Sequence, residues 1–265
     1  MATVKEIYQF LDQKAPFRYQ ADFDNAGFLV GRGDQVVSRI LIALDISTEV
    51  IQEAVRQRCQ LIVSHHPVIW GKIGQVTDET TTGKKLLQLI QNHISAICAH
   101  TNLDSVEGGV NSVLADKIGL LDPSPLEEDG IDETGISYGI GRVGRLSAGP
   151  MPLPQFVSVV KKSLHLEGVR GFDAGMPVCK VAVGGGACGG MLPLVKARGC
   201  DTFLTSDLKH DLYLEARELG INLLDAGHYS TEAVIRSTLE HWLKEQFPTV
   251  DVLVSTMEQE VFRYL

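Results

Sequence analysis

The sequence lacks the features of exported, membrane-spanning or disulfide-rich proteins. Its five cysteines are an odd number with no C-x-x-C spacing, which argues against a disulfide framework or a zinc knuckle. No uninterrupted apolar run approaches the roughly 20 residues of a membrane span. The first residues, MATVKEIYQFLDQ, carry charge too early and too often for a signal peptide. We therefore expect a cytoplasmic protein with no membrane segment.

Positive charge is also scarce, because 24 lysines and arginines stand against 33 aspartates and glutamates, for a net charge of −9. A protein that binds duplex nucleic acid needs a basic face, so this balance gives no strong nucleic-acid signature. An acidic chain instead favours cationic ligands such as metal ions. With 44% hydrophobic residues, the 265 residues can bury one large core or two small ones.

A dinucleotide-binding motif is present but out of place. Gly184, Gly186 and Gly189 satisfy G-x-G-x-x-G after a predicted strand, and Asp207 lies near the distance of a ribose-binding acid. However, the motif sits late in the chain, and VGGGACGG allows several registers. We therefore favour a tight turn over a nicotinamide site for residues 184–190. Phosphate binding at the following helix is left open.

Helical and strand-like patterns alternate along the chain. The expected helices lie at residues 4–16, 48–58, 83–93, 154–166, 191–199, 212–220 and 230–247. The expected strands, apolar runs that end in polar residues, lie at 36–47, 59–66, 93–104, 180–190, 201–207, 221–228 and 251–255. Residues 22–34, rich in Asp, Asn and Gly, are expected to form a loop. This alternation predicts an α/β fold with mainly parallel or mixed sheets flanked by helices.

The two halves of the chain resemble each other in the order of their segments. Residues 54–68 (AVRQRCQLIVSHHPV) parallel 194–210 (LVKARGCDTFLTSDLKH), and 92–104 (NHISAICAHTNLD) parallel 219–232 (LGINLLDAGHYSTE). We interpret this as two pseudo-duplicated α/β units, residues 1–125 and 126–265. The stretch 120–155, which holds five of the ten prolines, is expected to join them.

Residues able to bind metal follow the predicted strands. In parallel α/β sheets, ligands bind beyond the carboxyl ends of the strands. Glu232 follows His228 by four residues, so on a helix both side chains share one face. The full set of such residues is His65, His66, His100, Asp104, Asp207, His210, Asp225, His228 and Glu232.

These residue types explain the chemistry. Imidazole suits zinc, iron, nickel and manganese, while carboxylates neutralise ionic charge and can bridge two ions. Three histidines with two carboxylates commonly hold two metals roughly 3.5–4 Å apart, as in two-metal hydrolysis. Any one of these residues alone is as easily a polar strand cap or a helix N-terminal acid. Their recurrence at several strand ends favours a shared site to which both halves contribute.

The ordered strings LIVSHHP, CAHTNLD, GGGACGG, FLTSDLKH and DAGHYSTE, together with DNAGFLVG and IALDIS, resemble the NIF-three-like family. Its members are often labelled GTP cyclohydrolase 1 type 2 homologues. The resemblance covers nearly the whole chain, and it implies a two-part α/β fold with a di-metal site in a homohexameric ring. The short middle stretch matches the compact form of the family, which lacks an inserted domain. The family's metal ligands fall on His65, His66, Asp104, His228 and Glu232, ahead of their neighbours His100, Asp207 and His210.

Three functions are compatible with these observations. The first is a hydrolase with two divalent ions per subunit (zinc, iron, manganese, nickel or magnesium) that acts on a nucleotide-like or phosphorylated small molecule. Lys72, Lys209 and His210 are candidates to contact its anionic group. The second is a non-enzymatic role in metal binding, metal delivery or scaffolding, which needs the same ligands. The third, a nicotinamide oxidoreductase, rests only on the glycine turn.

Overall fold

The chain forms two compact units, which are described separately. The computed structural model describes residues 2–263. Unit 1 comprises residues 1–103 and 236–259, and unit 2 comprises residues 104–235 and 260–265. These bounds differ from the expected division at residue 125. The stretch 120–155 does not join the units but lies wholly within unit 2, and residues 236–259 return to unit 1.

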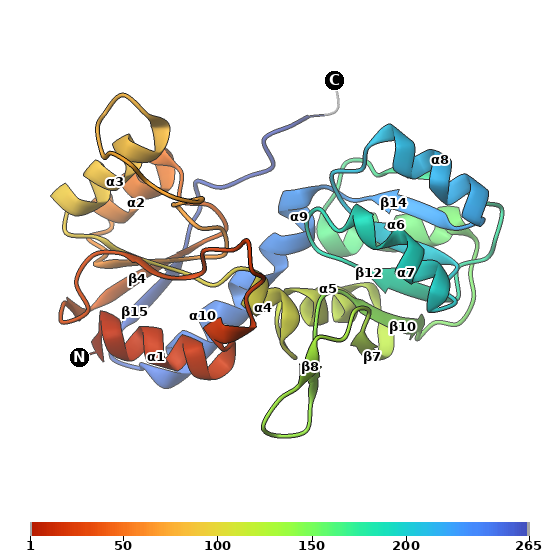
Figure 1. The fold of residues 1–265 in the computed structure, drawn as a ribbon, viewed down its shortest axis with the longest axis horizontal. Helices are drawn as coiled ribbons and strands as arrows, with labels where there is room; N and C mark the ends of the chain where they lie inside the picture. The colour runs from red at the N-terminus through yellow and green to blue at the C-terminus, as the bar shows by residue number, and fades with distance from the viewer. Residues whose placement is uncertain (1, 264–265) are drawn as a thin grey trace. The chain divides into compact units, whose positions relative to one another are not determined.

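Unit 1 is built on a five-stranded sheet. In spatial order its strands are β15 (Asp251–Val254), β4 (Arg39–Ala43), β5 (Leu61–Ser64), β6 (Ser95–Cys98) and β2 (Gly27–Val30). The first four are parallel and β2 is antiparallel to β6. Two layers of helices enclose the sheet in Figure 1: α2 (Thr48–Arg56) and α3 (Thr81–Gln91) on one face, α1 (Val4–Lys14) and α10 (Arg236–Gln246) on the other.

Local sequence signals explain where these helices begin. Thr3 and Glu6 form a reciprocal capping box at α1, and the Ser47 hydroxyl caps α2. Leu41 and Ile62 pack with Val50 of α2 in one buried cluster. The strands and helices expected in this unit are present. Residues 27–30, which were expected to form part of a loop, are an additional strand that pairs with β6. This segment is short and lies beside glycines, so its strand conformation depends on the pairing with β6.

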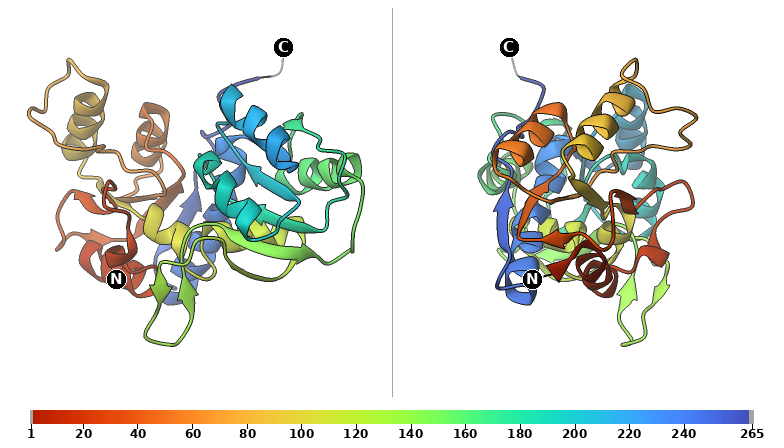
Figure 2. Two further views of the ribbon diagram at one scale, coloured as in Figure 1. Left: turned by 45° about the vertical axis from the view of Figure 1, so that its right-hand side comes forward. Right: turned by 90° about the vertical axis from the view of Figure 1, so that its left-hand side faces the viewer.

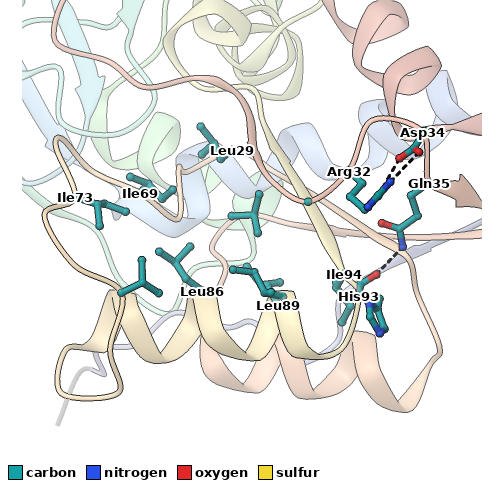
Figure 3. A pocket seen from close by; sticks show the side chains of 14 residues that line it. Leu29, Arg32, Asp34, Gln35, Ile69, Ile73, Leu86, Leu89, His93 and Ile94 are labelled. Atoms are coloured by element: carbon teal, nitrogen blue, oxygen red, sulfur yellow. Dashed lines mark hydrogen bonds and ion pairs between the residues drawn. The ribbon is translucent and has the colours of Figure 1, made fainter.

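A cavity of about 880 Å³ lies between α3 and the edge strand β2 (Figure 3). Its wall is mostly apolar and includes Leu29, Ile69, Ile73, Leu86, Leu89 and Ile94. The polar groups at its border bond to one another, since Arg32 pairs with Asp34 and Gln35 donates to the His93 carbonyl. Ile69 belongs to the loop that follows His65 and His66, so this loop borders both the cavity and the histidine pair.

Unit 2 contains a six-stranded mixed sheet. In spatial order its strands are β11 (Arg170–Phe172), β14 (Asn222–Asp225), β13 (Thr202–Thr205), β12 (Lys180–Val183), β10 (Arg142–Leu146) and β7 (Leu120–Pro125). Strands β12, β13 and β14 are parallel to one another, while β10 and β11 are antiparallel to their neighbours. A hairpin of β8 (Gly130–Ile131) and β9 (Ser137–Tyr138) projects from the unit in both views of Figure 2.

Alternating side chains bury both faces of this sheet. Val181 and Val183 pack with the helices α5 (Val110–Ile118) and α6 (Leu153–Leu164). Ala182 between them packs on the opposite side, with α7 (Leu192–Ala197) and α8 (His210–Leu219). This period of two is the signature of a strand covered on both faces.

The expected helix at residues 230–247 is broken into three pieces. These are α9 (His228–Glu232), a 3-10 turn at Ala233–Ile235, and α10. The break coincides with the passage from unit 2 to unit 1. Among the described residues, no helix has the length and apolar character needed to cross a membrane.

Candidate metal centre

Two adjacent histidines follow strand β5 in unit 1. The His65 side chain is fully buried, and its Nδ1 lies 2.9 Å from the carbonyl oxygen of Ala99. His66 is 12% exposed, and its Nδ1 lies 2.9 Å from Oδ1 of Asp45, which follows β4. The backbone N–H groups of Leu44 and Asp45 donate to the buried carboxylate of Glu258. Burial raises the pKa of Glu258, partly offset by these N–H groups.

His100, two residues beyond the end of β6, joins this pair. Its Nδ1 lies 2.8 Å from Oδ1 of Asp24, whose side chain is completely buried. The other oxygen of Asp24 accepts from the backbone N–H and the hydroxyl of Thr101. Burial opposes ionisation of Asp24, but the hydrogen bonds from His100 and Thr101 outweigh it and lower its pKa to about 2.

The three rings of His65, His66 and His100 lie close together. Their centroids are 5.0 to 5.5 Å apart, and one nitrogen from each lies within 4.8 Å of the others. Resemblance to the family favours His65 and His66 over His100, but the geometry of unit 1 brings all three together. Trp70, 58% exposed, stands 5.3 Å from the His100 ring, edge to face.

The partners of these rings decide which nitrogen can bind a metal. A carbonyl oxygen can only accept, so Nδ1 of His65 carries the proton. Carboxylates hold Nδ1 of His66 and His100 in the same way. Each neutral ring therefore presents the lone pair of Nε2, which is the arrangement found around metal-binding histidines.

In unit 2, helix α9 carries His228 and Glu232 on one face. His228 Nε2 lies 2.9 Å from Glu232 Oε2, and its Nδ1 lies 2.7 Å from Asp207 Oδ2. The imidazole thus lies between two carboxylates, which suits either an imidazolium or a cation held by Nε2 and Glu232. Asp207 has a φ of 54°, a left-handed conformation that is uncommon outside glycine. It orients His228.

The glycine turn packs against Glu232. A Cβ on Gly186 would lie 2.1 Å from Glu232 Oε1, and the φ of +66° also favours glycine. The Gly186 N–H donates to the hydroxyl of Thr231. This agrees with the expected tight turn. Helix α7, the helix after this turn that was considered for phosphate binding, has only six residues.

Asp104 is buried, 8% exposed, in the short helix α4 (Thr101–Ser105). Its backbone carbonyl accepts from the side chain of Asn111, and that amide also accepts from the N–H of Gly185. The thiol of Cys188 has a raised pKa, first because it is buried and then because the carboxylates of Asp104 and Glu232 lie near it. Asp104 and the ligands of α9 are thus tied to one glycine turn.

Other candidates have different roles. Asp225 is held by Arg170 at 2.6 Å and by the backbone N–H of Leu208, so it is a structural carboxylate. The three candidates for an anionic group, Lys72, Lys209 and His210, are exposed. A G-x-S-x-G segment at residues 135–139 lies around hairpin strand β9 and lacks the strand-to-helix turn of serine hydrolases.

Sequence reasoning named Asp207, which orients His228, but missed Asp24 and Asp45, which orient His100 and His66. Asp45 ends a predicted strand in IALDIS, so its position did carry a signal. Asp24 lay in a segment interpreted as loop and offered none. Asn111 also went unnoticed, because a polar residue inside a helix pattern is ordinary.

Relatives of this chain share its length and its fold. A family model described as Duf34/NIF3 (NGG1p interacting factor 3) matches residues 2–261. A "GTP cyclohydrolase 1 type 2 homolog" of Clostridium perfringens is 30% identical over 269 residues, covering 99% of each chain. A homolog of the same name from Streptomyces coelicolor is 36% identical over 236 residues, which is 88% of this chain and 82% of that one.

Two solved structures are similar over almost their whole length. A Bacillus cereus protein related to NIF3 has a TM-score of 0.94 at 23% identity, covering 100% of this chain and 99% of that one. Reduced HcgD from Methanocaldococcus jannaschii has a TM-score of 0.82 at 29% identity, with coverage of 97% and 98%. The alignment with a Staphylococcus epidermidis homolog runs over 368 positions, so that relative carries residues absent from this compact chain. The chain belongs to the Duf34/NIF3 family.

Proposed function

We propose that this protein binds two divalent metal ions through His65, His66, Asp104, His228 and Glu232. We further propose that it uses them as a hydrolase on a nucleotide-like or phosphorylated small molecule. The observation that carries the proposal is the shared bonding of the histidines. His65, His66 and His228 each have Nδ1 against a carbonyl or carboxylate oxygen, which leaves Nε2 as the nitrogen that can bind a metal; in His228 this atom lies 2.9 Å from Oε2 of the proposed ligand Glu232.

The donor set fits the ions proposed. Three imidazoles with two carboxylates match the preferences of zinc, iron, manganese and nickel more closely than those of magnesium. When bound, such ions polarise a substrate oxygen and lower the pKa of water. The protein's own residues supply orientation: Asp45 and Asp207 fix the rings of His66 and His228. Trp70 lies near His100, where it can limit access of water.

The substrate class rests on two supports. Relatives carry the name "GTP cyclohydrolase 1 type 2 homolog", which points to a nucleotide-like molecule without establishing a reaction. Lys209 and His210, exposed at the start of α8, follow directly on Asp207 and offer positive groups to an anion. They are the residues we assign to substrate binding.

Metal binding is tested on the stripped protein. After removal of metal with a chelator, zinc and manganese are titrated separately against the full chain, and bound metal is counted. We expect two ions per chain, with fewer or weaker ions in His65→Ala and in Glu232→Ala. His241→Ala is the matched control, because that histidine is 75% exposed on α10. Unchanged binding in both ligand variants would reject the site.

Catalysis is tested separately with a panel of nucleotides and phosphoesters. Turnover that needs metal and disappears in Glu232→Ala supports the hydrolase. Two tightly bound ions without turnover of any panel member would remove the hydrolase and leave metal binding or delivery. Transfer of the ion to an apo acceptor protein measures that alternative directly.

The proposal includes a homohexamer in the cytoplasm, as the family resemblance implies. Light scattering during size-exclusion chromatography gives the mass in solution. A mass of six chains of 28.9 kDa each supports this assembly, and a monomeric mass contradicts it.

A further inference from the structure

A completely buried arginine lies beside the Asp104 turn in unit 2. The side chain of Arg142, on strand β10, has no exposed surface. The nearest carboxylate, that of Glu107, is 4.0 Å away and 57% exposed. Burying a permanent charge is costly unless polar groups compensate it, and an apolar side chain of similar volume would avoid this cost. The guanidinium must therefore be understood through the groups that it contacts.

Those groups are mainly backbone carbonyls around Asp104. Nη2 donates to the carbonyls of Ser105 and Val106, at 3.2 and 2.7 Å. These are the two residues that follow Asp104 as helix α4 ends. Nη1 donates to the carbonyls of Gly139 and Gly141, both at 2.8 Å. One rigid planar group thus fixes the exit of the Asp104 turn against the start of strand β10.

Asn111 fixes the same turn from the other side. It is completely buried in the first turn of α5. Its Nδ2 donates to the Asp104 carbonyl at 3.0 Å, and its Oδ1 accepts from Gly185 N–H at 2.8 Å. Both ends of the buried amide are therefore paired with backbone groups.

The chain of contacts continues to Glu232. A Cβ on Gly185 would meet Glu232 Cγ at 3.4 Å, and Gly186 packs directly on the Glu232 carboxylate. Asn111 thus joins the backbone of one proposed ligand to the turn that bounds another. Every member of this series belongs to unit 2.

We propose that Asn111 and Arg142 are positioning residues of the metal centre. They hold the Asp104 turn at a fixed place relative to His228 and Glu232, so that its carboxylate is ready for the ion. This inference rests on the ligand set of the proposed function, and it adds two residues that contact no metal themselves.

The test compares residues of the same type that make similar bonds at different places. Asn111→Ala removes the bridge to Asp104. Asn222→Ala is its control, because Asn222 is also buried in unit 2 and bonds a carbonyl, Met176 O, and an N–H, Ala174 N. Arg142→Lys keeps the charge but cannot span the carbonyls. Its control is Arg198→Lys, which loses a bond to the Pro125 carbonyl.

Zinc affinity is measured by competition with a chromophoric chelator, and Co²⁺ absorption reports the coordination. Urea unfolding of the metal-free protein measures stability. We expect Asn111→Ala and Arg142→Lys to weaken zinc binding about 10- to 100-fold, the range for partners of metal ligands, and to change the Co²⁺ spectrum. The two controls lose stability without either change. If Asn111→Ala does not fold, Arg142→Lys carries the test.

A double-mutant cycle with Asp104→Ala makes the test decisive. If the two residues act through Asp104, they weaken zinc binding no further once that carboxylate is gone. Equal weakening in both backgrounds would overturn the inference, as would controls that weaken binding equally. If Asp104→Ala weakens zinc binding but neither positioning variant does, this inference alone fails. If Asp104→Ala itself has no effect, the ligand set of the proposed function fails with it.

Discussion

The three parallel strands at the centre of each unit are joined by matching backbone hydrogen bonds. In each unit the middle strand bonds to one neighbour at its start and to the other neighbour at its end. The two residues of the middle strand that make these bonds are four positions apart in both units. These bonds are Gln60 N to Arg39 O and Ala99 N to Ser64 O in unit 1, and Asp201 N to Lys180 O and Ala226 N to Thr205 O in unit 2. The strand orders β4–β5–β6 and β12–β13–β14 also agree. They support the expected duplication, which stays a prediction.

The candidate ligands do not follow this correspondence. When Gln60 is matched with Asp201, the positions of His65 and His66 correspond to those of Ser206 and Asp207. The middle strand is therefore followed by two imidazoles in unit 1 and by an orienting carboxylate in unit 2. His228 has its counterpart in Thr101, not in His100. The parallel strands of each unit therefore offer positions at the carboxyl edge of the sheet, and the candidate residues occupy different positions in the two units.

The two units also hold their donors differently. In unit 1 two side-chain carboxylates, Asp45 and Asp24, hold the rings of His66 and His100. In unit 2 the backbone of the glycine turn lies against Glu232 itself. Metal binding should therefore be more sensitive to added side-chain volume at the glycine turn of unit 2, and to loss of a carboxylate charge beside the histidines of unit 1.

The largest effect should come from Gly186→Ala. The added Cβ would lie 2.1 Å from Glu232 Oε1 at a positive φ, so Glu232 must move. We expect a loss of about 1–3 kcal/mol in the free energy of unfolding, together with loss of metal binding. Urea denaturation and metal titration measure the two effects. Gly190→Ala is the control, since its Cβ would meet nothing within 4 Å; equal losses in both variants would refute the crowding argument.

Replacing the orienting carboxylates compares the units directly. Asp45→Asn and Asp207→Asn each keep the shape but remove the charge that fixes a histidine ring. We expect each to weaken zinc binding about 10- to 100-fold, or about 1.4–2.7 kcal/mol. Calorimetric titration at one pH measures both. A loss confined to one variant would show that only that unit's histidine binds the ion.

Acid should remove a contribution specific to unit 1. The pKa of Asp24 is lowered in the folded state to about 2, from near 4 when unfolded. Its contribution is therefore complete above pH 4 and disappears as pH falls through about 2. Between pH 5 and pH 2, we expect the free energy of unfolding of Asp24→Asn to fall by on the order of 1–2 kcal/mol less than that of the unchanged protein. Unfolding measured from pH 5 to pH 2 gives the comparison, and parallel curves for the two proteins would contradict the assignment.

The smallest effect concerns a matched pair of thiols. Cys59 and Cys200 precede the middle strand of each unit, and burial raises the pKa of both to about 11. Both should therefore resist iodoacetamide equally at pH 8, while partly exposed Cys179 reacts first. Peptide mass spectrometry of the alkylated protein measures the order. Rapid modification of one buried thiol alone would show that the two positions differ in packing.

Sequence alone located most of the elements and the ends of the strands from which the candidate ligands come. Local patterns sufficed there, because a buried strand that ends in His65-His66 is visible in six residues. Strand β2 was missed because its identity depends on pairing with β6, about 70 residues away. The division into units differs from the expected one for a similar reason, since no local signal shows that residues 236–259 belong with unit 1.

The partners of the candidate ligands were also beyond local patterns. Asp24 meets His100 across 76 positions and Glu258 meets Leu44 across 214. A side chain that acts through such a contact looks ordinary in its own segment. Gly186 was recognised as part of a turn, but the carboxylate it accommodates was not.

The return of the chain to unit 1 affects the order in which a nascent protein can fold. Residues 104–235 of unit 2 are continuous, so this part is complete while strand β15 is still unmade. Until β15 pairs with β4, the strand β4 is an unpaired edge, which invites aggregation. The same late segment brings Glu258 to the backbone of Asp45, the partner of His66. Synthesis must therefore pass Glu258 before the backbone of Asp45, and with it the partner of His66, is held in place.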